Sequence, residues 1–329
     1  MSLNNRGIQI IGLGSVVLAC AVSAFTPACA ETPTRECRVG ADCATGICGD
    51  DGQCVREGTP GVDSGIAEDA PSSSDGATTD GPTGDSSLPG CVPNKDGTIT
   101  RDEVPIAAGL HATYKIGTSE NVSTAGTTGA GGKRVWDFSA ALASDQSVIV
   151  ETQALTGKWY ETKFAGATYA SKLSVSKDLL GVFETSPGAL LLRGVVSPTE
   201  SASGTSLTYT PAVSVLKFPL TMGAAWTTDA TASGTAAGVD LAFFPTTEKY
   251  ESKVDAEGEL KTPLGTFNVL RVAIVLTRKV TTGVVVTPTV VRSFAFVTEC
   301  YGTVATVTSA DNEANAEFTS ASEIRRISP

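Results

Sequence analysis

The chain has 329 residues, with 35 acidic and 24 basic side chains, a net charge of -11, one histidine and eight cysteines. Nucleic-acid affinity comes largely from clustered Lys and Arg, and no such cluster is present, so the composition argues against a nucleic-acid partner. His111, the single histidine, excludes any metal site that needs two imidazoles.

Residues 1–30 have the pattern of a cleaved secretory signal peptide. Arg6 supplies the positive start, residues 7–25 carry no charge, and Ala28-Cys29-Ala30 has the small residues of a signal-peptidase site. Cleavage after Ala30 would leave six cysteines in the mature chain, an even number that suits an oxidising compartment. The sequence therefore predicts an exported protein, either secreted or periplasmic.

A second cleavage site remains open. Val17-Leu18-Ala19-Cys20 resembles the lipobox of bacterial lipoproteins, which would place a lipid on Cys20 and make the protein an outer-membrane lipoprotein. Lipidation at Cys29 would also leave six cysteines. A lipid anchor of this kind is the only membrane contact that the sequence predicts.

Residues 31–56 are predicted to form a small cysteine-rich module. The segment is rich in Gly and Asp and nearly lacks large apolar side chains, so it cannot build a core and needs cross-links. Two disulfides of unknown pairing are the favoured interpretation, and a four-cysteine zinc site is the alternative, although its ligands usually come in closer pairs. The four residues are Cys37, Cys43, Cys48 and Cys54.

Residues 57–90 are predicted to be a disordered acidic linker. They contain seven acids, no Lys or Arg, and otherwise almost only Gly, Ser, Thr, Pro and Ala. This composition buries too little apolar area to offset the entropy of ordering. Most of the net charge lies here, so the remainder of the chain is nearly neutral.

Residues 91–104 resemble the calcium loop of the EF-hand family. Gly97 occupies the position of the sharp turn and Ile99 that of the buried hydrophobe. Val92 stands where the first acidic ligand belongs, and a preceding helix is not predicted. The resemblance implies a calcium ion as the one cofactor to consider, and its ligands would be Asn94, Asp96, Thr98, Thr100 and Glu103.

Residues 105–329 predict an all-β domain, an antiparallel sandwich or (half-)barrel of about a dozen strands. Short Val-, Thr- and aromatic-rich runs alternate with Gly, Pro, Asn and Asp, and two segments, Ser186–Gly188 and Asp255–Gly258, look like hairpin turns. The predicted strands are 111–116, 134–138, 147–153, 159–164, 180–184, 189–196, 207–210, 225–230, 247–255, 268–280, 284–299, 301–309 and 316–327.

Alternation assigns faces to the late strands. Val272, Ile274 and Leu276 should share the core face of one strand, and Phe294 and Phe296 that of the next. Polar or charged residues bracket the first set and are assigned to solvent: Arg271, Thr277 and Arg278.

Cys91 and Cys300 are the two cysteines left once the module is paired. A bridge between them would close a loop that spans nearly the whole β domain and would stabilise it by about 4 to 5 kcal/mol on the chain-entropy argument. We therefore predict this disulfide.

The order of signal, cysteine-rich module, acidic linker and β domain resembles uncharacterised exported proteins and lipoproteins of the myxobacterial type. Within the β domain, Phe218–Trp226 and Thr262–Val272 resemble strands of envelope β domains, and the second also resembles a strand of half-barrel periplasmic lipid and lipoprotein carriers.

Three functions follow as expectations. The first is a non-enzymatic binding or scaffolding domain for an envelope or extracellular ligand, displayed on the linker. The second is a carrier of an apolar ligand, which requires an internal cup rather than a filled core. The third is a carboxylate-dependent hydrolase, since four glutamates lie on predicted strands. They are Glu151, Glu161, Glu251 and Glu299.

Overall fold

A computed structural model describes residues 91–174 and 177–329. The strands are β1 (Thr98–Ile99), β2 (His111–Asn121), β3 (Thr127–Thr128), β4 (Arg134–Asp137), β5 (Gln146–Gln153), β6 (Tyr169–Lys172), β7 (Leu180–Ser186), β8 (Ala189–Val196), β9 (Ser206–Lys217), β10 (Leu220–Thr221), β11 (Ala225–Ala236), β12 (Val239–Asp240), β13 (Thr246–Lys261), β14 (Thr266–Thr282), β15 (Val285–Thr298), β16 (Gly302–Ser309) and β17 (Ser320–Ile327). The predicted signal peptide, lipidation site at Cys20, cysteine-rich module and linker lie outside the described residues.

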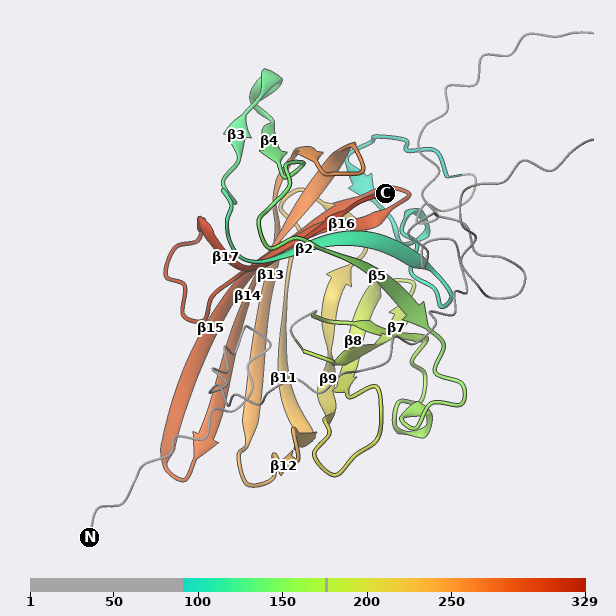
Figure 1. Ribbon diagram of the computed structural model, residues 1–329, viewed down its shortest axis with the longest axis vertical. Coiled ribbons are helices and arrows are strands. Elements are labelled where there is room, and N and C mark those ends of the chain that lie inside the picture. The colour runs from blue at the N-terminus through green and yellow to red at the C-terminus, as the bar shows by residue number, and fades with distance from the viewer. Residues whose placement is uncertain (1–90, 175–176) are drawn as a thin grey trace, which may run out of the picture. The chain divides into compact units, whose positions relative to one another are not determined.

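Twelve antiparallel strands close into a barrel (Figure 1). Their order is β11-β9-β8-β7-β6-β5-β2-β17-β16-β15-β14-β13, and pairing of Ala225–Ala232 with β13 closes the ring. The predicted all-β class is thus confirmed, in its barrel form. Shorter strands join the rim: β4 runs parallel to the end of β13, β3 pairs with β4, β12 with β11, and β1 with β10.

Helix is confined to three short 3-10 turns in the described residues, η2 (Arg101–Glu103), η3 (Ala130–Gly132) and η4 (Glu161–Lys163). Within those residues, none of the helices is long and apolar enough to span a membrane. The predicted strand 159–164 is therefore wrong, because η4 occupies it. Tyr160 and Phe164 follow a helical rather than an alternating spacing, and both pack with Leu180 and Val182 on the outside of the barrel.

One of the two predicted hairpins is confirmed. Ser186 pairs with Ala189 across the turn between β7 and β8. The other is wrong, because Asp255–Gly258 lies within β13, at a bulge between Val254 and Ala256. Gly258 serves a close contact instead of a turn: a Cβ there would lie 2.0 Å from the carbonyl oxygen of Arg134 on β4.

The segment between β2 and β5 covers the outer face of β13–β17. Trp136 and Phe138 from this cover pack edge-on against Phe296, with ring centroids 5.0 and 5.5 Å apart. Phe294, on the same face, stacks on Phe318. The predicted core positions Phe294 and Phe296 are confirmed, and the core they form lies outside the barrel wall.

Both arginines assigned to solvent are buried, so that assignment is wrong. Arg278 is 5% exposed and lies on the inner face with Leu276, where its Nε donates to the Glu248 carboxylate at 2.6 Å. Arg271 is 4% exposed and lies on the outer face under the cover, where it donates to Asp255 and Glu317. Carboxylate partners make these positions tolerable for a charged side chain.

The N-terminal part of the described chain, residues 91–106, is here called the strap. Its apolar residues Ile99, Val104 and Ile106 are buried in one core cluster with inward-facing residues of the barrel, among them Leu190, Leu216, Trp226, Val254 and Val272. The strap therefore fills part of the barrel interior.

Candidate ligand-binding site

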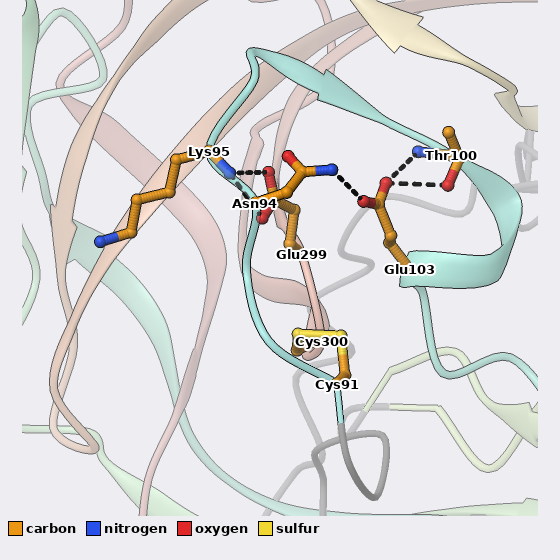
Figure 2. Close-up of a disulfide and its surroundings, with 7 residues drawn as sticks. All are labelled: Cys91, Asn94, Lys95, Thr100, Glu103, Glu299 and Cys300. Carbon is orange, nitrogen blue, oxygen red and sulfur yellow. Dashed lines mark hydrogen bonds between the residues drawn. A yellow bond between two sulfur atoms is a disulfide. The ribbon is translucent and has the colours of Figure 1, made fainter.

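The strap is fixed to the turn between β15 and β16 (Figure 2). The predicted disulfide between Cys91 and Cys300 is present, with the two Cα atoms 5.5 Å apart. The backbone N–H of Lys95 donates to both oxygens of Glu299, at 3.1 and 3.2 Å, and the N–H of Cys300 donates to the carbonyl of Glu103 at 2.7 Å. These contacts hold the apolar end of the strap in place.

The residues predicted to bind calcium form the bend of the strap. Glu103 accepts hydrogen bonds from the backbone N–H and the hydroxyl of Thr100, both at 2.8 Å, and from the Asn94 amide at 2.8 Å (Figure 2). Asp96 accepts from the backbone N–H of Thr98 at 2.7 Å. In the part of the chain that the structure describes, His, Cys, Asp and Glu do not gather in any group of three that could hold a metal ion. Calcium at this loop stays a prediction from the sequence.

A cleft of about 520 Å³ lies between the strap, the β3–β4 hairpin and the ends of β13–β15. It is lined by several charged side chains, and most of these already have partners. Lys133 lies 3.2 Å from the Glu257 carboxylate, and Glu299 accepts from the strap backbone. The charged groups of this outer cleft therefore serve mainly to attach strap and hairpin to the barrel.

A second cavity, of about 290 Å³, opens to solvent at a rim that includes the exposed His111, and its deeper wall is formed by residues that face the barrel interior. Val104, Pro105 and Ile106 of the strap line one side of it. The facing wall is contributed by β2, β5–β9, β16 and β17, through Ala112, Tyr114, Val150, Thr152, Tyr169, Ser171, Phe183, Leu190, Val215, Leu216, Thr303, Thr306 and Arg325.

Several of these wall residues are only half-buried although they face inward. Val150, Phe183, Val215 and Thr306 all belong to this group. In a filled core the same positions would be covered by neighbouring side chains, because protein interiors pack as densely as organic crystals. The barrel interior is therefore densely packed where the strap enters it, and the space beside the strap is incompletely filled by side chains.

Aromatic hydroxyls mark the polar parts of this wall. The Tyr114 hydroxyl donates to the Thr303 carbonyl at 2.9 Å, and burial raises the pKa of Tyr114 to about 12, opposed by the nearby Arg325 charge. Burial also raises the pKa of Tyr169, again opposed by a cation, Arg101. Both hydroxyls therefore remain neutral donors over the physiological range.

A buried ionic cluster lies on the inner face nearer the β12 end of the barrel. Glu248 accepts from Arg278 at 2.6 Å and from the Tyr250 hydroxyl at 2.5 Å. The pKa of Tyr250 is raised well above its usual value, mainly by burial and to a lesser extent by the neighbouring Tyr209 and Glu248. Because each charge has a partner, this cluster is a fixed polar part of the wall.

The four glutamates of the hydrolase hypothesis are spread over the molecule. Glu151 and Glu251 are exposed on β5 and β13, and Glu161, in η4, accepts from the backbone N–H of Gly157. Glu299 is buried and lines the outer cleft. The other three line neither cavity.

The cavity residues, in contrast, were missed at the sequence level. Thr303, Thr306 and Arg325 lie on strands that were predicted, but inward-facing polar residues look like solvent-exposed ones. One signal was present: in β16 the neighbours of Thr306, Ala305 and Val307, are apolar and fully buried on the opposite face. A strand whose side chains are fully buried on one face and carry small hydroxyls on the other is suited to separate a hydrophobic core from a cavity.

Comparison of the chain with family models, with curated proteins and with solved structures gave no match.

Proposed function

We propose that this chain is an exported, non-enzymatic binding protein whose barrel carries a small, mainly apolar ligand. The observation that supports this proposal is the cavity of about 290 Å³ beside the strap, which is lined mostly by aliphatic and aromatic side chains, with a few hydroxyls and the cationic side chains of Lys172 and Arg325. Small-molecule sites have this character, and their volumes begin at about 300 Å³. A pure scaffold would gain stability by filling the same space.

The predicted N-terminal segments give this function its setting. A signal peptide would export the chain, the cysteine-rich module would form its N-terminal end, and the acidic linker would hold the barrel at a distance from that module or from a lipid anchor. In this proposal the barrel meets its ligand in the envelope or outside the cell.

Two neighbouring residues of β5 offer a matched test. Val150 lines the cavity, whereas Ile149, on the opposite face of the strand, is 62% exposed. The neutral ligand decanol, titrated calorimetrically into the full chain, should bind the wild-type protein. Val150→Trp should abolish that binding because the indole occupies the cavity, and Ile149→Trp should leave it intact.

Thermal unfolding of both variants would show that each is folded before titration. Equal decanol binding by the two tryptophan variants, or no binding by the wild-type protein, would contradict a carrier function in this cavity.

A further inference from the structure

The charged side chains that line this cavity are of one sign. Lys172 and Arg325 are among the described residues that line it, and those residues include no Asp or Glu. Lys172 has Asp178 3.9 Å away at the rim. Arg325 lies deeper, with its side chain 15% exposed, and is the cation that a molecule in the cavity would meet.

Arg325 projects from the inner face of β17, where it pairs with Thr306 on one side and Ile116 on the other. Its Nε donates to Glu323 at 2.7 Å, one terminal nitrogen donates to the Lys172 carbonyl at 3.3 Å, and the other donates to the Leu173 carbonyl. A guanidinium has five N–H donors. Among the described contacts, two donors of Arg325 are left for a further acceptor.

Glu323 orients this guanidinium. Its second oxygen accepts from the Ser174 hydroxyl at 2.7 Å, and Glu323 is not among the cavity-lining residues. The positive charge of Arg325 nonetheless acts on the wall, because it lowers the pKa of Tyr114 against the effect of burial. Glu323 thus holds the Arg325 guanidinium in one orientation, as a supporting residue does in sites where an arginine binds an anion.

The opposite part of the cavity is apolar. Tyr169 and Phe183 stack with ring centroids 5.2 Å apart, and Leu190, Val215 and Leu216 continue the same surface toward the strap. One cavity thus combines an apolar wall with a fixed guanidinium.

We propose that the ligand of this cavity is an amphipathic carboxylate, with its carboxylate on Arg325 and its hydrocarbon part against the aromatic and aliphatic wall. This inference rests on the proposed carrier function and adds the chemical class of the ligand. A planar guanidinium with two available N–H donors matches a carboxylate in shape as well as in charge.

Three ligands with one hydrocarbon chain and different head groups test the proposal: decanoate, decanol and decylamine, titrated calorimetrically into the full chain at neutral pH. Decanoate should bind about tenfold or more tightly than decanol, the gain typical of a charge-assisted hydrogen bond, and decylamine should bind most weakly. Equal affinities for the three ligands would overturn the carboxylate assignment while leaving the carrier function standing. Failure of decanol and decanoate alike to bind would overturn both.

Arg325→Gln should remove the preference for decanoate, so that the ratio of decanoate to decanol affinity falls to about one. Because this variant removes the guanidinium that pairs with Glu323, the double variant Arg325→Gln/Glu323→Gln provides a neutral pair at the same place. The matched control is Arg193→Gln, which removes an arginine that is paired with Glu184 and does not line the cavity. A decanoate preference that persists in both Arg325 variants would contradict the role of this guanidinium.

Discussion

Three arginines of this barrel are buried, and each is neutralised by a carboxylate. Arg278 pairs with Glu248, Arg271 with Asp255 and Glu317, and Arg326, fully buried beneath the cover, with Asp145. Their positions could not be assigned from residue type, which favours solvent for arginine. Parity does place Arg278 with Leu276, two residues away on the same strand. The carboxylate partners lie at least sixteen residues away in sequence, so only the folded structure brings them together.

Tyr114, a half-buried residue of the cavity wall, should affect stability at alkaline pH. Burial raises the pKa of Tyr114 from 10.0 to about 12, so the unfolded chain releases this proton first. The stability that comes from burying the neutral Tyr114 hydroxyl is therefore complete below pH 10 and is lost as the pH rises toward about 12, with a loss on the order of 3 kcal/mol. Chemical denaturation of wild type and Tyr114→Phe across this range should give a smaller decline for the variant. Parallel declines in the two proteins would contradict the burial of this hydroxyl.

Among the elements, strand β4 can pair with β13 because Gly258 on β13 has no side chain in its way. It runs parallel to β13 over Gly258–Lys261, and the backbone of Arg134 passes where a Cβ of Gly258 would lie. The sequence suggested a turn here because Gly and Asp are frequent in turns. Only the fold reveals that the glycine permits close backbone approach and so helps to hold the cover on the barrel.

Gly258→Ala should destabilise the protein. Its Cβ would lie 2.0 Å from a backbone oxygen, so β4 or β13 must move, at a cost of about 1–3 kcal/mol. Gly265→Ala is the matched control, because no atom lies within 4 Å of its Cβ position. Thermal unfolding of the two variants gives the comparison. Equal midpoints would mean that β4 does not approach β13 as closely as described.

Most long strands could be predicted from sequence, and the reason is visible in particular elements. Strand β8 matches its prediction at both ends because its apolar run is bounded by a Pro-Gly turn and by Ser-Pro. Strand β6, with only four residues, was missed, since Tyr169–Lys172 is too short to alternate clearly. The disulfide could be predicted because Cys91 and Cys300 are the two cysteines left once the four of the expected module are paired with one another.

At the scale of the whole molecule, closure of the sheet decides what is inside. The pairing of β11 with β13 completes the ring, and this single contact between strands turns one sheet face into a cavity wall. Alternation along a strand separates its two faces, but it does not show which face points into the barrel once the sheet has closed. For this reason the barrel form was one of several sequence-level alternatives, and residues such as Thr306 and Arg325 became candidates only in the folded chain.

Methyl-resolved NMR of the full chain titrated with decanoate shows whether a ligand enters the cavity beside the strap. We expect shifts for methyl groups of Val150, Leu190 and Val215, which line the cavity, and none for Ile149 and Val284, which are 62% and 99% exposed. Shifts confined to Val269, which lines the outer cleft, or no shifts at saturating decanoate, would contradict it.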